Sequence, residues 1–475
     1  MSGPLVVLGD ALLDRDVEGR VERLCPDAPV PVVDGPEERP RPGGAGLAAA
    51  LAARAGRREV VLVTALAGDE AGRELAGLLG AAGVQLVDLG LDGATPEKVR
   101  VRAAGRTLLR LDRGGEAGTV GAIGAAGLRA LALADAVLVA DYGRGVAAEP
   151  TVRHALSELP ARVPLVWDPH PRGATPVAGV RLATPNHAES ARLVPGVRGD
   201  GLAAVTTRAR AVAERWRAAA VAVTLGARGA LLLGGDAPPL VVPATPAPGG
   251  DPCGAGDQFA ATATALLADG ALPSEAVAGA VAAASAFVAA GGAAAVPLDG
   301  QGGQGDAPPD GGAGAAASPA TGWERAEAVI AAVRARRGTV VATGGCFDLL
   351  HAGHVATLRA ARQLGDCLVV CLNSDASVRR LKGPGRPLVG EADRAAVLWA
   401  LESVDAVVVF DEGTPEATLD RLRPDVFAKG GDHALADLPE TALLASWGGQ
   451  AVTLPYLPGR STTRLVKEAA RRANH

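Results

Sequence analysis

Aromatic side chains, lysine and basic charge are all scarce in this chain of 475 residues. Phe, Trp and Tyr make up only 3% of the residues, which argues against the stacking platforms that bind single-stranded nucleic acid. The formal net charge is −5, so the chain has no overall basic field to hold nucleic acid or an anionic membrane. We therefore expect neither nucleic acid nor a membrane as a partner.

Cysteine is also scarce, and the spacing of the cysteines matches no disulfide framework. The five cysteines, at positions 25, 253, 346, 367 and 371, form no Cys-x-x-Cys pair and no even disulfide pattern, which favours the reducing cytoplasm. The start of the chain lacks the basic and long apolar regions of a signal peptide. The run 276–296 has the length of a membrane span, but its Ala and Gly are weakly apolar, so we predict a buried Ala-rich helix.

One segment lacks any apolar period. Residues 299–320 are mostly Gly, Ala, Pro and Asp, a composition typical of a flexible linker. This linker divides the chain into predicted domains at 1–298 and 321–475. In both domains short β-branched runs alternate with Ala-, Leu- and Arg-rich helical stretches, which indicates α/β folds with parallel sheets. Ligands of such sheets bind at the carboxyl ends of the strands.

The strongest signal in the first domain is a glycine-rich helix start. Gly254, Ala255 and Gly256 precede a long Ala-rich helix, and Asp257 follows them directly. Successive backbone N–H groups at a helix N-terminus form a nest for an anion. Asp257 would then lie beside a phosphate, where it could take a proton from an attacking hydroxyl. A plain helix entry is the alternative, but the ordered glycines and carboxylate favour phosphate chemistry.

Because they contain this glycine-rich helix start and its carboxylate, residues 1–300 resemble the ribokinase-type (PfkB) carbohydrate kinases. The resemblance implies a ribokinase-like α/β/α domain with a small β lid, in which Asp257 is the catalytic base and residues 254–256 form the anion hole. For ATP and magnesium it implies Asn186, Glu189, Thr224 and Gly226, and for the sugar Asp14, Gly43, Gly44, Arg110, Asp112 and Asp141.

The sequence departs from that family at two positions. A family asparagine that contacts the sugar is Leu47 here, and a family lysine after Asp168-Pro is His170. Both departures concern the sugar contacts and the kinase efficiency, and they leave the phosphate-transfer residues in place. A weakened or differently specific kinase is therefore an alternative reading of the first domain.

The second domain carries two histidines at a predicted helix start. The run from Thr343 contains three glycines and ends in His351-Ala-Gly353-His354. Histidines spaced i, i+3 lie on one helix face, where they can donate hydrogen bonds to phosphoryl oxygens. A zinc site is the alternative, but no further ligands stand at plausible spacing.

This motif is typical of the cytidylyltransferase-like nucleotidyltransferases, and residues 338–472 resemble the adenylyltransferase half of the bifunctional enzymes of ADP-heptose synthesis. The resemblance implies a Rossmann-like α/β domain in which His351 and His354 are catalytic. It implies nucleotide or phosphate binding by Gly345, Phe347, Asp348, Gly353, Lys382, Lys429, Gly430, Asp432, Ser461, Thr462, Thr463 and Arg464.

The two resemblances together imply a bifunctional cytoplasmic enzyme. Its kinase would phosphorylate D-glycero-β-D-manno-heptose 7-phosphate at the anomeric hydroxyl. Its transferase would adenylylate heptose 1-phosphate and release pyrophosphate. ATP would serve both domains, with Mg²⁺ held by the phosphates and by Glu189, and the chain would form a homodimer. A non-catalytic sugar-phosphate or nucleotide sensor is the rival hypothesis, although such a sensor has no need of Asp257.

Overall fold

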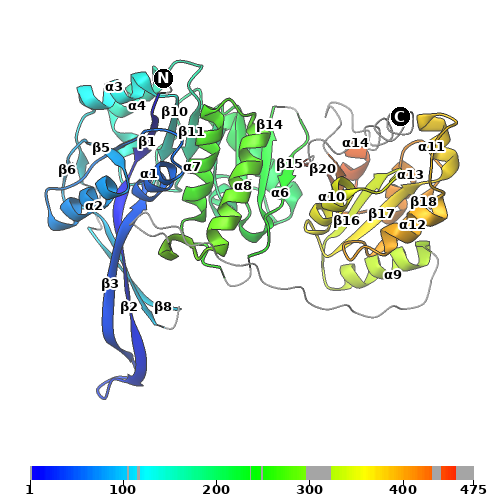
Figure 1. Cartoon of the computed structure of the whole chain (residues 1–475), viewed down its shortest axis with the longest axis horizontal. Helices are drawn as coiled ribbons and strands as arrows, with labels where there is room; N and C mark the ends of the chain where they lie inside the picture. The colour runs from blue at the N-terminus through cyan, green and yellow to red at the C-terminus, as the bar shows by residue number, and fades with distance from the viewer. Residues whose placement is uncertain are drawn as a thin grey trace, which may run out of the picture. The chain divides into compact units, whose positions relative to one another are not determined.

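The computed structural model describes residues 3–103, 106–114, 118–235, 237–247, 250–295, 322–430 and 440–455. The chain forms two compact units, which hold most of the residues before 296 and most of those after 321, respectively (Figure 1). The predicted linker, 299–320, lies outside the described residues.

The first unit is built on a parallel sheet. Its strands run in the order β5 (Val84–Asp88), β4 (Val60–Thr64), β1 (Leu5–Gly9), β10 (Ala136–Ala140), β11 (Leu165–Asp168), β12 (Leu182–Ala183) and β13 (Ala220–Thr224). Strands buried on both faces need apolar residues at nearly every position, which explains the unbroken runs of the sequence. The strand order reverses between β1 and β10, and such a reversal opens a crevice for ligands at the carboxyl ends. An antiparallel hairpin of β14 (Ala230–Gly234) and β15 (Leu240–Val242) follows β13 in the chain.

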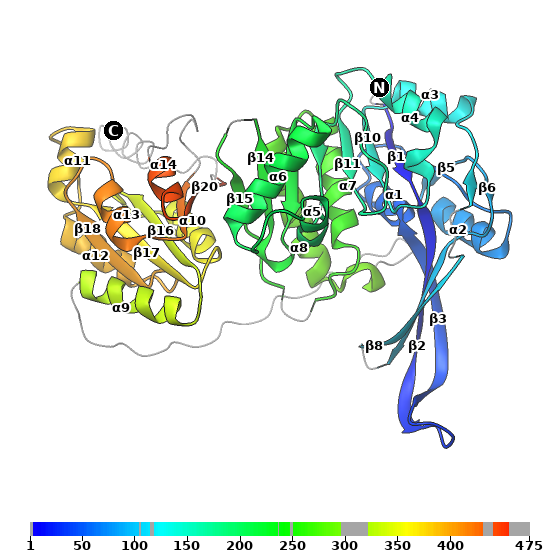
Figure 2. The ribbon, with the colours of Figure 1, turned by 180° about the vertical axis from the view of Figure 1, so that it is seen from behind.

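Helices cover both faces of this sheet. In Figure 1 α7 (Ala255–Ala268) and α8 (Pro273–Ala289) lie in front, and in Figure 2, seen from behind, α5 (His187–Leu193) and α6 (Leu202–Trp216) lie in front. The remaining helical elements before residue 296 are α1 (Ala45–Arg54), α2 (Glu70–Ala81), α3 (Ala125–Leu133), α4 (Pro150–Ser157), η1 (Val146–Ala148), η2 (Gly226–Arg228) and η3 (Gly292–Ala295).

The Ala-rich stretch near residue 280 forms α8, whose buried side chains include Ala276, Val277 and Ala280. The predicted Ala-rich helix is confirmed, but it ends at Ala289 and is buried on one face only. Within the described ranges, no helix is both long enough and apolar enough to span a bilayer.

A second, four-stranded sheet forms the small lid that the sequence predicts. Its order is β3 (Pro31–Gly44), β2 (Ala11–Leu24), β7 (Glu97–Ala103) and β8 (Arg106–Arg113). The β2–β3 hairpin is buried at its base, near Leu12 and Gly43, and exposed towards its tip. Figure 2 shows it projecting from the first unit, and a further short pair joins β6 (Leu91–Asp92) to β9 (Thr119–Val120).

The second unit is a Rossmann-like parallel sheet. Its strands run in the order β18 (Ala406–Phe410), β17 (Cys367–Asn373), β16 (Val340–Gly345), β19 (Val426–Gly430) and β20 (Gln450–Leu454). The order reverses between β16 and β19, so the crevice at their carboxyl ends is the expected ligand site.

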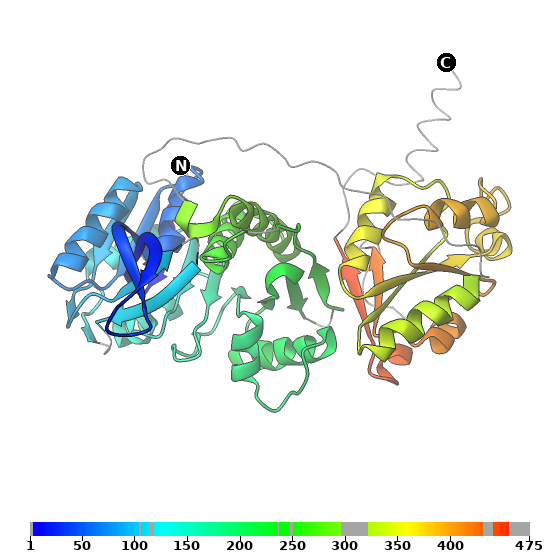
Figure 3. The same ribbon diagram turned by 90° about the horizontal axis from the view of Figure 1, so that it is seen from below.

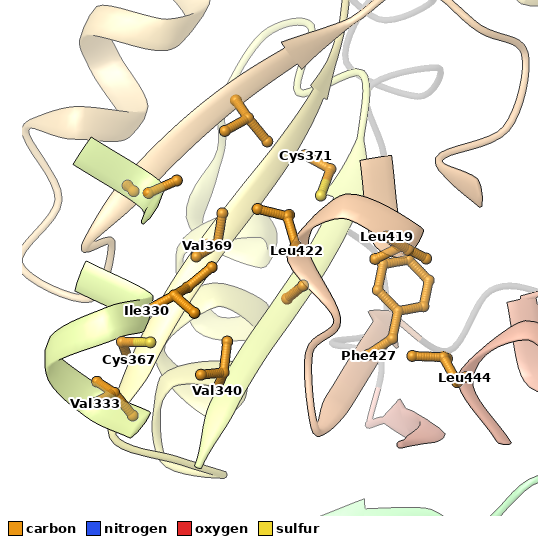
Figure 4. Close-up of a cluster of buried hydrophobic side chains, with 14 of the residues drawn as sticks. Ile330, Val333, Val340, Cys367, Val369, Cys371, Leu419, Leu422, Phe427 and Leu444 are labelled. Carbon is orange, nitrogen blue, oxygen red and sulfur yellow. The ribbon is translucent and has the colours of Figure 1, made fainter. Parts of the chain in front are cut away.

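Helices lie on both sides of this second sheet, as the view in Figure 3 shows. They are α9 (Gly322–Ala335), α10 (Ala352–Arg362), α11 (Asp375–Lys382), α12 (Glu391–Trp399), α13 (Glu416–Leu422) and α14 (Glu440–Ala445). Ile330, Val369, Cys371, Leu419 and Phe427 belong to the buried cluster between sheet and helices (Figure 4). The predicted fold class, a ribokinase-like domain followed by a Rossmann-like one, is confirmed.

Candidate active sites

The glycine-rich helix start of the first unit has the backbone that an anion site requires. Gly254 is the N-cap of α7 with φ +81°, a left-handed conformation that glycine adopts without strain. A Cβ at this position would also lie 2.9 Å from Leu47 Cδ2. The Ala255 N–H donates to the Pro252 carbonyl at 3.1 Å. The next N–H groups, those of Gly256 and Asp257, belong to the first turn of the helix. N–H groups of a first turn have no acceptor within the helix, so these two can bind an anion.

Asp257 lies in the first turn of α7, and its carboxylate is buried with two polar neighbours. The Tyr142 hydroxyl donates to Asp257 Oδ1 at 2.5 Å, and Lys98 Nζ lies 5.3 Å from the centroid of the Tyr142 ring. Burial raises the pKa of Asp257 to about 6, although the Tyr142 hydrogen bond and the Lys98 charge both lower it. A carboxylate with a pKa near the working pH is well suited to general base catalysis.

Three of the predicted sugar-binding residues lie together at the base of the lid. Asp14 on β2 accepts hydrogen bonds from Arg41 Nη1 at 3.1 Å and from Arg100 Nη1 at 2.7 Å. A Cβ on Gly43 would lie 2.6 Å from Asp14 Oδ2, and Gly44, with φ +58°, is the N-cap of α1. The lid strands and α1 therefore meet where Asp14 is held between two guanidinium groups.

The other predicted sugar-binding residues have partners of their own. Arg110 and Asp112 lie on the exposed strand β8 and form a two-point pair, with contacts of 2.7 and 2.8 Å. Asp141 accepts from the N–H groups of Gly143 at 2.8 Å and Ala174 at 2.7 Å, and burial raises its pKa to about 6. Asp141 thus orders the loop after β10, whichever sugar contacts it also makes.

Two of the four predicted ATP and magnesium residues, Asn186 and Glu189, stand at the start of α5. Asn186 Oδ1 accepts from the Glu189 N–H at 2.9 Å, and Glu189 Oε2 accepts from the Asn186 N–H at 2.8 Å, which is a capping box. Thr224 pairs with Asn186 in a parallel bridge, and Gly226 begins η2 with φ +61°. Burial raises the pKa of Glu189.

The two departures from the kinase family have definite places. Leu47 is 4% exposed and packs with Leu51 and Ala293 beneath the anion loop. It is a core side chain that offers no polar atom. His170 Nδ1 accepts from the Arg172 N–H at 3.2 Å, and burial lowers the pKa of the His170 ring, so the ring is neutral at neutral pH.

In the second unit the loop after β16 places both motif histidines at the start of α10. Phe347 and Leu349 in this loop have φ +45° and +63°, a strained conformation for such residues that recurs at functional sites. His351 is the N-cap, and its Nδ1 accepts from the Gly353 N–H at 3.1 Å. His354 Nδ1 accepts from the His351 N–H at 3.4 Å, and the two rings stack with centroids 4.0 Å apart.

These hydrogen bonds assign the protons of both rings. Because each Nδ1 accepts a backbone N–H, each neutral ring carries its proton on Nε2. The pKa of His354 is lowered to about 4, chiefly by burial and further by the charges of His351 and Lys382. His354 is therefore a neutral Nε2–H donor at neutral pH, and such a donor stabilises charge that develops on a phosphoryl group.

Of the other predicted transferase residues, Phe347 lies beside the histidines at the helix start, and Asp348 holds a neighbouring loop in place. Phe347 packs its ring against Gly345 and lies 5.4 Å from the His354 ring. Asp348 accepts from Arg386 Nη1 at 2.5 Å and from the Leu388 N–H at 2.9 Å, so its carboxylate orders a loop.

Lys382 is the last residue of α11. Lys429 Nζ donates to Glu440 Oε1 at 3.2 Å, and a Cβ on the next residue, Gly430, would lie 3.5 Å from Thr357 of α10. Asp432, Ser461, Thr462, Thr463 and Arg464 lie outside the described residues.

Sequence reasoning missed two residues that organise these sites. Arg394 on α12 is buried and donates to the carbonyls of Cys346 at 2.6 Å and Asn373 at 2.9 Å, so it joins the loops after β16 and β17. Tyr142 directly follows Asp141, a predicted site residue, but its contact with Asp257 spans 115 residues of chain. No local pattern marks either contact. Within the described ranges, no three His, Cys, Asp or Glu side chains gather as metal ligands.

Comparison with known proteins assigns a family to each half of the chain. Residues 4–299 match the family model described as pfkB family carbohydrate kinase, and residues 342–466 match the model described as Cytidylyltransferase-like. Among solved structures, Arabidopsis thaliana ribokinase complexed with ribose and ATP matches with a TM-score of 0.49 and 22% identity, covering 61% of this chain and 93% of that one.

Curated relatives match along the whole chain. The protein named Bifunctional protein HldE from Streptomyces coelicolor is 58% identical over 98% of this chain and 96% of its own length. The protein of the same name from Azorhizobium caulinodans is 39% identical over 98% of both chains.

The folds, the sites and these matches define a carbohydrate kinase joined to a nucleotidyltransferase. The chain belongs to the HldE family of bifunctional heptose kinases and adenylyltransferases, and it is an enzyme of both kinds.

Proposed function

We propose that the first unit transfers the γ-phosphoryl group of ATP to the anomeric hydroxyl of D-glycero-β-D-manno-heptose 7-phosphate, giving the 1,7-bisphosphate. The second unit transfers the adenylyl group of ATP to heptose 1-phosphate, giving ADP-heptose and pyrophosphate. The observation that carries the kinase assignment is the position of Asp257, buried in the first turn of α7 three residues after the left-handed Gly254.

In the kinase reaction the carboxylate and the helix start have complementary roles. Asp257 takes the proton of the anomeric hydroxyl as its oxygen attacks phosphorus. The N–H groups of the first turn and the helix dipole stabilise the charge on the transferring group. Asp14, fixed by Arg41 and Arg100, is placed to accept a hydrogen bond from the sugar.

We propose Mg²⁺ as the metal of both reactions, held mainly by the ATP phosphates. Oxygen donors are the ligands that this ion prefers, and Glu189 is the described carboxylate that we assign to it. The donor chemistry fits a cation, because Glu189 supplies carboxylate oxygens. Desolvation, and after it the negative charge of Glu189, raises the pKa of the Asp168 carboxyl. A bound Mg²⁺ would supply charge neutralisation at the phosphates.

In the transferase reaction a phosphate oxygen of heptose 1-phosphate attacks the α-phosphorus of ATP. The bond to the β-phosphate oxygen breaks, and pyrophosphate leaves. The histidine rings at the start of α10 donate Nε2–H to the α-phosphoryl oxygens as charge develops there. The cationic Lys382 and Lys429 are candidates for holding the triphosphate.

We further propose a cytoplasmic homodimer that pairs through the lid. Large apolar side chains are exposed on the lid at Val21, Leu24, Leu108, Leu109 and Leu111, and such a patch is typical of an interaction surface. All five cysteines are free, which suits a reducing compartment. Light scattering tests the pairing: Leu109→Asp should yield monomers, and an unchanged mass would contradict it.

The experiment for the two reactions assays each with its own substrates. Heptose 7-phosphate and ATP should yield the bisphosphate, and heptose 1-phosphate and ATP should yield pyrophosphate and ADP-heptose. The buried, apolar Leu47 favours one alternative, a kinase of weakened or altered sugar specificity. Pyrophosphate release without bisphosphate formation would support that alternative and refute the proposed kinase substrate.

A further inference from the structure

The hydrogen bond between Tyr142 and Asp257 joins two segments that lie 115 residues apart in the chain. Tyr142 follows β10 in the loop 141–145, and Asp257 lies in the first turn of α7. The hydroxyl donates to Oδ1 of the carboxylate at 2.5 Å, which is the short distance expected when the acceptor is ionised. Among the described residues no hydrogen bond reaches the other oxygen, Oδ2.

The loop that carries Tyr142 is held by a buried carboxylate. Asp10, directly after β1, accepts from the N–H groups of Tyr142 at 3.0 Å, Arg144 at 2.9 Å and Val146 at 3.0 Å. Three charge-assisted bonds to one side chain fix the backbone of the loop. Tyr142 is half-buried, and its hydrogen bond to Asp257 gives its hydroxyl a defined position relative to α7.

We propose that Tyr142 is a positioning residue of the kinase, whose hydroxyl binds Oδ1 of Asp257 and thereby turns Oδ2 towards the substrate hydroxyl. This inference rests on the proposed role of Asp257 as the base. In the reaction the anomeric oxygen forms its bond to the γ-phosphorus as the bond to ADP breaks, and the hydroxyl proton passes to Oδ2. Tyr142 keeps its own proton throughout, since burial holds the pKa of its hydroxyl well above the usual value.

The same hydrogen bond sets the pH at which the base is ready. The charged groups that face Asp257 are Lys98 from β7, Asp14 from β2, Arg41 from β3 and Asp168 at the end of β11. Lys98 and Arg41 lower the pKa of Asp257, whereas Asp14 raises it. The Tyr142 hydrogen bond stabilises the ionised carboxylate, so its loss must raise the pKa of Asp257 further.

The test is the pH profile of kinase kcat/KM for Tyr142→Phe. The acid limb of the unmodified enzyme should lie near pH 6, the value to which burial raises the pKa of Asp257. In the variant the limb should move by about one pH unit towards alkaline pH, the size expected for one charge-assisted hydrogen bond. The plateau kcat should also fall, while KM for ATP stays the same. A merely structural tyrosine would lower activity equally at every pH.

The chain offers a matched control, because Tyr456 is its only other tyrosine. Tyr456→Phe should leave the kinase profile unchanged. The variant Asp257→Asn distinguishes failure of the proposed base from failure of the proposed role of Tyr142. If that variant keeps normal kinase turnover, the proposed base is wrong. If it is inactive and Tyr142→Phe shows an unmoved acid limb, Asp257 stands and the role of Tyr142 is refuted.

A second measurement avoids any doubt about folding of the phenylalanine variant. In a Tyr456→Phe background, biosynthetic 3-fluorotyrosine would label Tyr142 alone. The fluorinated phenol is a stronger donor of nearly the same shape, so the acid limb should move to lower pH, opposite to the shift in Tyr142→Phe. Equal limbs in the labelled and unlabelled proteins would overturn the proposal.

Discussion

His354 provides the sharpest test of the transferase site, because its two ring nitrogens have separate tasks. Nδ1 accepts the His351 N–H at 3.4 Å, and Nε2–H is left for the phosphoryl group. Asparagine can replace Nδ1 as the acceptor but cannot reach as far as Nε2. Glutamine can place an amide N–H near the Nε2 position. The pair His354→Asn and His354→Gln therefore separates capping from catalysis.

These contacts determine how much turnover and stability each variant should lose. Loss of one donor aimed at developing charge costs about 10²–10³ in kcat, or about 2.7–4 kcal/mol, so His354→Asn should lose that much with little change in KM for ATP. His354→Gln should retain about ten-fold more turnover than His354→Asn, because it keeps a donor. The cap contact is long, so neither variant should lose more than about 1 kcal/mol of stability.

The assay is pyrophosphate release from heptose 1-phosphate and ATP, followed from pH 5 to pH 8, with metal content measured on the same samples. Since the pKa of His354 is lowered to about 4, the unmodified enzyme should show no acid limb from this ring within that range. Full turnover in His354→Asn would refute the donor role. Stoichiometric zinc in the unmodified protein, lost in both variants, would show that the rings are metal ligands.

Three further predictions concern the kinase and the linker. Asp257→Asn should lower kinase turnover by about 10²–10⁴-fold and leave pyrophosphate release unchanged; loss of both activities would contradict separate sites. Gly254→Ala should destabilise the kinase unit by about 1–3 kcal/mol in thermal unfolding, because φ +81° strains an alanine and its Cβ would press on Leu47. A Tm equal to that of the unmodified protein would show that the loop relaxes. Cleavage within 299–320 should give two fragments that each keep one reaction, since each has its own set of parallel strands and its own buried core; aggregation of both would argue against independent domains.

The parts of the sites that the sequence could predict are local. Gly254 and Asp257 are three residues apart, as are His351 and His354. Residues this near to each other in the chain take their relative positions from the geometry of the helix start. The parallel sheets were also predictable, because buried strands need apolar runs and the helices between them need caps. These features require no knowledge of which strand lies beside which.

The remaining parts depend on long-range packing. Tyr142 reaches Asp257 only because β10 and α7 come together, and Arg394 joins two loops that follow β16 and β17. Motif resemblance assigned Asp348 to the nucleotide, whereas the structure pairs its carboxylate with Arg386. A sequence motif marks a position that matters, but it does not say whether the side chain meets the ligand or supports the loop that does.

The central claim is that one chain carries two separate active sites, and a crossed assay of two variants tests it most directly. Bisphosphate formation and pyrophosphate release are measured on Asp257→Asn and on His354→Asn. The account predicts that the first variant loses bisphosphate formation alone and the second loses pyrophosphate release alone, each by at least about 10²-fold. Loss of both reactions in either variant, or of neither, would contradict it.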